Sequence, residues 1–443
     1  MVIQGKTHRV PPSENQLNES VFEWIVRPLQ ELLYSEEFAA DARLEPTAFT
    51  RQRTLPFPHL VMLLLNLRKG SIGDELDRFF EVLHGQSPAD SVTPSAFCQA
   101  RKKLDPRALM ALNRPLLKSF EDHFSPRLWH GLRLLAVDGS TACLPNTDDV
   151  IATFGAPPVG ASAPLARFSR RYDVLNNLVI EANLEAHHVS ERVHLAATRD
   201  NDLILYDRGY PAFWLFALHH QEQRHFCARM TLNFSHEVTD FLDRGKSSEV
   251  VWFTPGPKAC QQCRRYGLSC EPIPLRLIRV PLKGGQTEVL ATSLLDEQAY
   301  PTPWFKHLYH LRWGVEEGYK QEKCRLEIEN FSGLSAQFVQ QDFYAKIFAL
   351  NLTAFLAWIA QAIADCLYQD RKHAYRVNFA NALSKMKDNL VRLFICNSPG
   401  KLLTALIRAM ASCVEAVRPD RSYPRKSKPP KLRRFHPNYK RCR

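Results

Sequence analysis

LRLLAV, residues 132–137, is a short apolar run that leads directly into Asp138, and this stretch decides the fold class. A short, mainly apolar run of this length is typical of a buried strand, and the acid after it marks the carboxyl end. LILYD, residues 203–207, repeats the pattern and ends at Asp207. We therefore expect two buried strands, each with a carboxylate at its end.

The residues between and after these runs complete a mixed sheet. RFSRRYDVL (167–175) and LVIEANLEAHH (178–188) are strand-like and meet at two asparagines, which tolerate the positive φ angles of a tight hairpin turn. PAFWLFALHHQ (211–221) then opens a helix with a proline near its start. Strand, hairpin, strand and helix in this order are required by an RNase H-like sheet. The predicted class is therefore mixed α/β, with Asp138 and Asp207 at neighbouring strand ends.

The rest of the chain divides by pattern and composition. Residues up to about 125 have apolar positions three and four apart, as in FPHLVMLLLNLRKG (57–70), and are expected to be helical. Glycine, proline and strand-like runs between about 232 and 300 indicate a β-rich insertion. The expected domains are a helical N-terminal DNA-binding domain (1–125), an RNase H-like catalytic domain containing that insertion (126–366), a helical C-terminal region suited to dimerisation (367–417) and a basic disordered tail (418–443).

One N-terminal helix carries a cluster of basic residues. Thr93 is placed to cap its start, with Pro94 in its first turn. Arg101, Lys102 and Lys103 follow near its end. This basic end suits a DNA backbone, and a solvated helix face explains it as well.

The charge balance also points to a polyanionic partner. The 443 residues carry a formal net charge of +12, with 45% hydrophobic and 23% charged residues, as in a globular protein. A basic excess favours nucleic acid, because neutralised phosphates release their counterions. The alternative is a merely soluble basic protein. The lysine- and arginine-rich tail favours nucleic acid further.

Compartment and membrane association follow from three features. The first residues lack the apolar segment of a secretory signal, so we expect a cytoplasmic protein, and its 11 cysteines are expected to be reduced thiols. The segment at 347–364 has the length of a short spanning helix. Asn351, Thr353 and Gln361 interrupt it, which favours a buried core helix and no membrane partner.

The strongest chemical signal is YHLRWGVEEGYKQEKCRLEIENFSG, residues 309–333. At about 100° per residue, Tyr309, Arg312, Glu316 and Lys323 fall on one narrow helix face. A face with an acid, two bases and a phenol does not belong in an apolar core. A salt-bridged exposed helix is the alternative, since such charge spacings are common.

These four residues resemble the signature of DDE-class insertion-sequence transposases of the insertion-sequence-four type. That signature has Tyr, two residues, Arg, three residues, Glu, six residues and Lys, and the spacing here departs nowhere from it. The resemblance extends to LLAVDGS (134–140), LILYDRGY (203–210), FTRQRTLPF (49–57) and SAFCQARKKL (95–104), so it covers about residues 48–355.

The resemblance implies that Asp138, Asp207 and Glu316 are catalytic and hold two divalent metal ions. Hard oxygen ligands suit Mg²⁺, with Mn²⁺ as a substitute, and two such ions can activate the attacking oxygen and stabilise the leaving one. Asp138 would bridge both ions. Arg312 and Lys323 would bring positive charge to DNA phosphates, and Tyr309 would hydrogen-bond one of them.

Weaker signals lie nearby. Trp313 suits stacking on a flipped base or simple packing, and Arg229 resembles a DNA-contacting residue at a strand end. Cys260, Cys263 and Cys270 begin with a CxxC spacing that suits zinc, but no fourth ligand is evident, and free thiols in a loop are the favoured interpretation.

The predicted function is transposition of an insertion sequence in the bacterial cytoplasm, on nucleoid DNA. The expected partners are the terminal inverted repeats, target DNA and a second copy of the chain in a synaptic homodimer, with no small-molecule substrate. An inactive DNA-binding relative and a nuclease or resolvase are the alternatives. Intact acids at 138, 207 and 316 count against the inactive relative.

Overall fold

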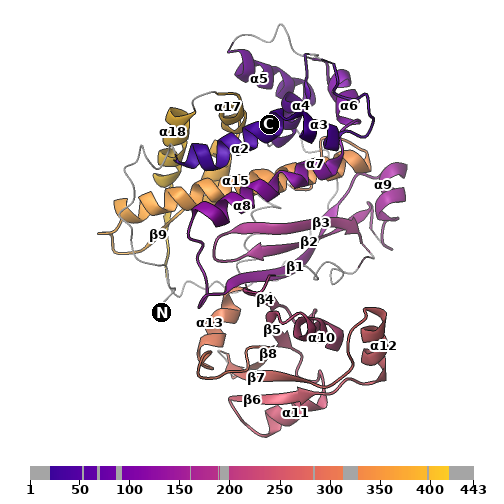
Figure 1. Cartoon of the computed structure of the whole chain (residues 1–443), viewed down its shortest axis with the longest axis vertical. Helices are drawn as coiled ribbons and strands as arrows, with labels where there is room; N and C mark the ends of the chain where they lie inside the picture. The colour runs from indigo at the N-terminus through magenta and orange to yellow at the C-terminus, as the bar shows by residue number, and fades with distance from the viewer. Residues whose placement is uncertain are drawn as a thin grey trace.

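The computed structural model describes residues 20–51, 54–66, 70–85, 92–159, 161–187, 189, 199–282, 285–312, 328–396 and 399–418. One sheet runs through the middle of the molecule, with helices of both ends of the chain above it in Figure 1. Its eight strands lie in the order β3-β2-β1-β4-β5-β8-β7-β6. They are β1 (Arg133–Cys143), β2 (Leu165–Asp173), β3 (Leu178–Ala186), β4 (Asp202–Tyr206), β5 (His225–Met230), β6 (Ser248–Phe253), β7 (Ile273–Pro281) and β8 (Thr287–Thr292).

The sheet is mixed, as the sequence predicted. Strands β1, β4 and β5 are parallel, and the hairpin of β2 and β3 pairs antiparallel to β1. Asn177 in the hairpin turn has φ 58°, the left-handed conformation that asparagine tolerates. The mixed α/β class is therefore confirmed.

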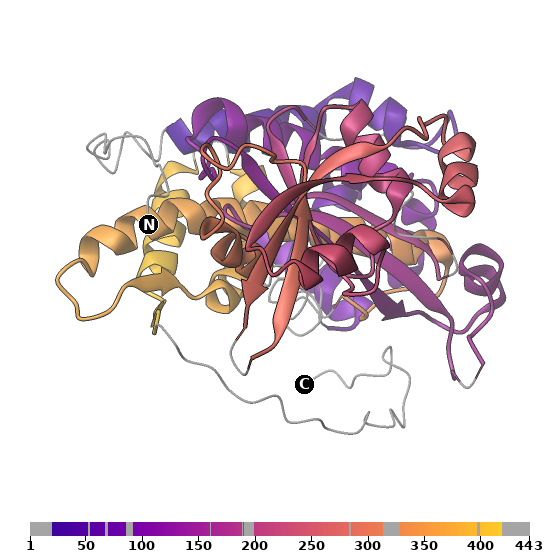
Figure 2. The same cartoon turned by 90° about the horizontal axis from the view of Figure 1, so that it is seen from below.

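The segment between about 232 and 300 extends this sheet. Strand β8 pairs antiparallel with β5, β7 with β8, and β6 with β7. The helices here are α11 (His236–Asp243) and α12 (Pro257–Arg265), which follow α10 (Phe213–Gln221) in the chain. Figure 2, which looks up from below, shows how the twist of the sheet carries these strands across the molecule.

The elements described between residues 20 and 123 are helices whose ends follow local signals. Helix α6 begins after the Thr93 cap with Pro94 in its first turn, as predicted, and α5 ends at Gly85, which has φ 70°. The elements are η1 (Phe22–Val26), α2 (Arg27–Tyr34), α3 (Glu36–Ala42), α4 (Phe57–Leu65), α5 (Ile72–His84), α6 (Pro94–Arg101), α7 (Pro106–Ala111) and α8 (Asn113–His123). They share one hydrophobic core with the C-terminal helices and one face of the sheet.

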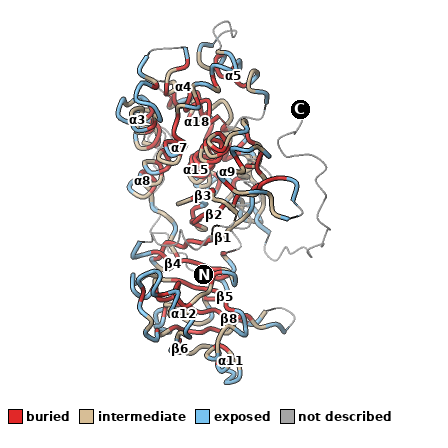
Figure 3. Tube along the Cα trace, turned by 90° about the vertical axis from the view of Figure 1, so that its right-hand side faces the viewer, coloured by how far each residue is buried: buried red, intermediate tan, exposed pale blue. Residues whose placement is uncertain are grey.

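Helix α15 (Ala336–Leu367) is the centre of that core (Figure 3). It is long and apolar enough to cross a membrane, yet 72% of its most apolar window is buried inside the protein. Its polar side chains have partners: the Asn351 amide donates to the Val179 carbonyl at 2.8 Å, and the Gln361 amide donates to the Tyr375 carbonyl at 2.8 Å. This packing is that of a buried core helix, as the sequence favoured.

The region after α15 differs from the predicted all-helical pattern. Its helices are α16 (Phe379–Met386), α17 (Asn389–Ile395) and α18 (Gly400–Ala411), but two short strands, β9 (Tyr375–Val377) and β10 (Val414–Ala416), pair antiparallel. Three-residue strands carry too few positions to show a period, so the sequence did not reveal them. The remaining helices are α9 (Asp148–Phe154) and α13 (Trp304–Leu311). The predicted tail beyond residue 418 lies outside the described residues.

Candidate active site

Asp138 and Asp207 lie at the same level of two adjacent parallel strands. Ala136 of β1 is in register with Leu205 of β4, so two further residues along each strand bring Asp138 level with Asp207. Neighbouring strands are about 4.8 Å apart, so register alone brings the backbones of these acids together. The sequence predicted this meeting of two strand ends.

One detail of the prediction was wrong, because Asp138 does not end its strand. Strand β1 continues to Cys143, since β2 goes on pairing with it after β4 has stopped. Asp138 therefore lies at the point where β1 loses its neighbour on the β4 side. Its Oδ1 atom accepts a hydrogen bond from the Gly139 amide at 2.9 Å, which fixes the carboxylate against its own strand.

Both acids are on the face of the sheet that also carries α13. Side chains alternate along a strand, so Asp138 shares its face with Leu134 and Ala136, which belong to the core around α15. Helix α13 contributes Leu308 and Tyr309 to the same core. The described end of α13 therefore lies on the same face of the sheet as both acids.

Tyr309 and Arg312 connect this helix to the second acid. The Tyr309 hydroxyl lies 3.4 Å from Asp207 Oδ1, to which it donates, and Arg312 Nη2 lies 4.0 Å from the same oxygen. Tyr309 and Arg312 are each 3% exposed, whereas the Asp207 side chain is 36% exposed. Burial raises the pKa of the Tyr309 hydroxyl, with Asp207 and Glu288 adding to the effect, so the phenol stays a neutral donor.

The other signature residues cannot be placed beside them. Glu316, Lys323 and Trp313 lie outside the described residues, so their roles stay predictions. The structure describes the first two signature residues, Tyr309 and Arg312, and both lie next to Asp207.

Glu288 is a buried acid of this region that the sequence analysis missed. It lies on β8 and is 9% exposed. Its Oε1 atom forms an ion pair with Arg229, 2.8 Å from Nε. Burial raises the pKa of the Glu288 carboxyl; Arg229 and Arg312 oppose that rise, and Asp207 adds to it. Arg229, Arg312 and Asp207 thus all act on the Glu288 carboxyl. The available signal was an acid in the otherwise apolar run TEVLAT, at 287–292.

The basic end of α6 differs from the expected surface cluster. Arg101 is fully buried, and its guanidinium donates to Gln341, Ser332, the Phe338 carbonyl and Asp342, the last at 3.0 Å. Its role is to hold α6 against α15, which corrects the expectation of a surface cation at this position. Lys102 is exposed and Lys103 is partly exposed, so DNA contact at these two stays a prediction. DNA contact by Arg229 likewise stays a prediction.

The cysteine cluster provides no support for zinc. Cys260 and Cys263 lie on α12, and the Cys270 thiol donates to the Cys260 carbonyl at 3.5 Å. Burial raises the pKa of the Cys263 thiol to about 11. Across the residues that the structure describes, no three histidine, cysteine, aspartate or glutamate side chains are placed to hold a metal ion, and every described cysteine is a free thiol.

Comparison with known proteins defines the class. Residues 169–352 match the model of the transposase DDE domain, a segment that contains Asp207 and the predicted Glu316 and begins after Asp138. Over 404 residues the chain is 25% identical to transposase InsG for insertion sequence element IS4 of Escherichia coli (strain K12), with 86% of each chain covered. Residues 169–352 are thus similar to the transposase DDE domain, and most of the chain is similar to an insertion-sequence transposase, which supports a DNA-cleaving and DNA-transferring enzyme.

A solved structure is also among the matches. The piggyBac transposase synaptic complex with hairpin DNA matches with a TM-score of 0.46 and 10% sequence identity, over 87% of this chain and 85% of that one. Enzymes with the DDE domain generally use divalent metal ions.

Proposed function

We propose that this transposase binds the terminal inverted repeats of its own element, cleaves DNA at their ends and joins those ends to target DNA. The catalytic acids would be Asp138, Asp207 and Glu316. The observation that carries the proposal is the register of β1 and β4, which brings Asp138 level with Asp207 on the face that carries α13. The strand order β3-β2-β1-β4-β5 supports an RNase H-like core.

The two described acids fit divalent metal ions by their chemistry. Both are carboxylates that lie level on adjacent strands, and the Asp207 side chain is exposed enough to take a ligand. Oxygen donors without histidine or thiolate suit Mg²⁺, with Mn²⁺ as a substitute. When bound, two such ions would supply a nucleophilic oxygen at neutral pH and stabilise the leaving oxygen. Asp138 would hold both ions, and Asp207 and Glu316 one each.

The neighbouring side chains position the second acid and the DNA phosphate. Tyr309 donates toward Asp207, which orients the carboxylate. Arg312 keeps a fixed positive charge 4.0 Å from the same oxygen, and that charge would also attract a phosphate. Lys323 and Trp313 would contact DNA from the part of the signature that follows. Pairing of two element ends implies a homodimer.

Strand joining tests the proposal directly. The purified chain is incubated with Mg²⁺, a labelled duplex from the DNA flanking its gene, and a supercoiled target plasmid. We expect labelled plasmid to form, and cleavage in the absence of target to pass through a hairpin product. Binding without cleavage would support an inactive DNA-binding relative, and cleavage without joining would support a nuclease.

A further inference from the structure

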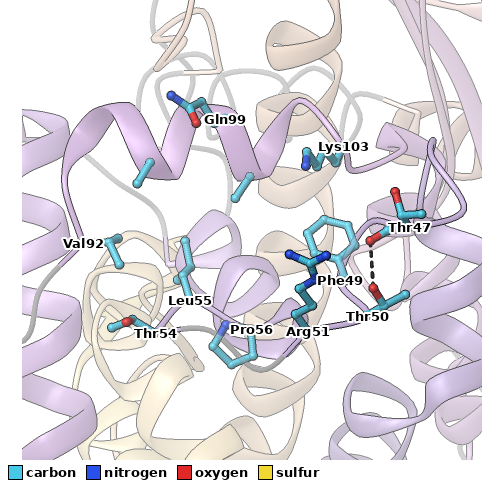
Figure 4. Close-up of a pocket in the computed structure, with 12 residues that line it drawn as sticks. Thr47, Phe49, Thr50, Arg51, Thr54, Leu55, Pro56, Val92, Gln99 and Lys103 are labelled. Carbon is cyan, nitrogen blue, oxygen red and sulfur yellow. Dashed lines mark hydrogen bonds between the residues drawn. The ribbon is translucent and has the colours of Figure 1, made fainter.

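A cavity of about 550 Å³ opens between the loop before α4 and the helix α6 (Figure 4). Its walls come from two N-terminal segments that are far from the catalytic acids in the sequence. Its lining residues are Thr47, Phe49, Thr50, Arg51, Thr54, Leu55, Pro56, Val92, Ala96, Gln99, Ala100 and Lys103. A volume of this size is typical of a site for a small organic group.

The charges of the lining favour an anionic ligand. Arg51 and Lys103 are the cationic side chains among the described residues that line it, and these include no aspartate or glutamate. Glu45 lies outside the lining, with its Oε2 atom 4.0 Å from Lys103 Nζ. Three threonines and one glutamine add neutral hydrogen-bonding groups. Guanidinium, ammonium and hydroxyl donors together are suited to a phosphate.

The remaining lining residues are suited to a base and a sugar. Leu55, Pro56 and Val92 are apolar, and Phe49 presents an aromatic ring. Figure 4 shows Phe49 beside Arg51 at one end of the cavity and Val92 at the other. A phosphate gains nothing from such surfaces, whereas a base stacks on an aromatic ring and a deoxyribose packs on apolar groups.

Contacts within the protein hold parts of both walls in place. Phe49 has φ 60°, an uncommon conformation for a side chain of its size, and its ring packs on Phe57 at 5.5 Å between centroids. The Thr50 hydroxyl donates to the Thr47 carbonyl at 2.9 Å within the loop. The buried Arg101 anchors the opposite wall, α6, to α15. Such pre-organisation lowers the entropy lost on binding.

We propose that this cavity takes up one nucleotide that has left the base stack of the element-end DNA. Its phosphate contacts Arg51 and Lys103, and its base lies against Phe49. The proposal rests on the proposed function, because it deepens how the enzyme binds its own ends. The base would be selected here, at a site separate from the acids.

The test uses the full chain and end duplexes in which 2-aminopurine replaces one base at a time, since this base brightens when unstacked. Wild type should bind the duplex and produce a fluorescence increase at one position. Ala96→Leu adds an apolar group at an exposed position that lines the cavity, so it fills the site while both cations stay. We expect it to weaken end binding about tenfold and to remove the increase.

Ser95→Leu is the matched control, because Ser95 is exposed on the same helix and does not line the cavity. It should bind as wild type does. Phe49→Leu, which keeps an apolar group but removes the ring, should also lose the fluorescence increase, with folding checked by thermal unfolding.

The outcomes separate the two proposals. A wild-type protein that cleaves its ends while Ala96→Leu and Ser95→Leu bind equally well would overturn the nucleotide site alone. Weaker binding by Arg51→Gln and Lys103→Gln, with no effect of Ala96→Leu and no brightening, would reduce the cavity to a backbone contact and also overturn it. A wild-type protein that neither binds nor cleaves the ends would overturn the proposed function and, with it, this site.

Discussion

Two regions of the molecule have opposite chemistry: the part of the sheet around Asp138 and Asp207, and the cavity beside α6. The first gathers carboxylates beside a buried phenol and guanidinium, whereas the described lining of the second combines cations with an aromatic ring and includes no aspartate or glutamate. Figure 1 shows α6 among the helices above the sheet, with β4 far below it. The difference indicates that one region performs the chemistry and the other recognises DNA. Substitutions in each should therefore have separable effects.

The largest effect is expected from the acids. Asp138→Asn and Asp207→Asn keep the shape of the side chain but remove the negative charge that a divalent ion requires. Each should lower strand joining by at least about a thousandfold, with end binding unchanged or slightly tighter. Gel assays of joining and of binding, run in parallel, measure the two effects.

Asp240→Asn is the control for the acids, because Asp240 is exposed on α11 and the substitution is chemically identical. It should join DNA at the wild-type rate. If Asp138→Asn reduced end binding as much as joining, that result would contradict the assignment of chemistry and DNA recognition to separate regions.

The next effect concerns the wall of the cavity. Arg101→Met should destabilise the protein by about 3–5 kcal/mol, because it leaves Asp342 buried without its cation. Arg107→Met is the matched control: the Arg107 side chain is 81% exposed in its ion pair with Asp105, so its loss should leave the free energy of unfolding nearly unchanged. Denaturant unfolding measures both, and equal costs would contradict an anchoring role.

A smaller effect is expected at Glu288, which shares its surroundings with Arg229, Arg312 and Asp207. Glu288→Gln removes the charge that holds Arg229, and we expect joining at saturating DNA to fall about tenfold, equivalent to about 1.4 kcal/mol of barrier. End binding should stay the same, and Glu288→Asp should recover part of the rate. Loss of binding with no change in saturated rate would place Glu288 in DNA recognition instead.

Local signals in the sequence predicted much of the fold. The Thr93 cap, the turn at Asn177 and the two apolar strands each depend on a few neighbouring residues. The closeness of Asp138 and Asp207 could also be predicted, because the order of strand, hairpin and strand in an RNase H-like sheet makes the two acid-bearing strands neighbours.

The features that were missed depend on contacts distant in the chain. Nothing near Arg101 shows that its partner is Asp342, 241 residues later, so a buried anchor looked like part of a surface cluster. Glu288 joins the site only because β8 pairs with β5, and the cavity exists only because residues 47–51 and 54–56 meet α6. Charge and spacing identify candidate residues, while tertiary packing decides which of them reach solvent.

The central claim is that Asp207 is a metal ligand in strand joining, and Asp207→Cys tests it most directly. A thiolate is a softer ligand than a carboxylate, so it binds Mg²⁺ poorly and accepts Mn²⁺ more readily. We predict that this variant is inactive with Mg²⁺ and regains part of its joining activity with Mn²⁺, while wild type is active with both and inactive with EDTA. Joining by Asp207→Cys at the wild-type rate in Mg²⁺, or joining by wild type in EDTA, would contradict the account.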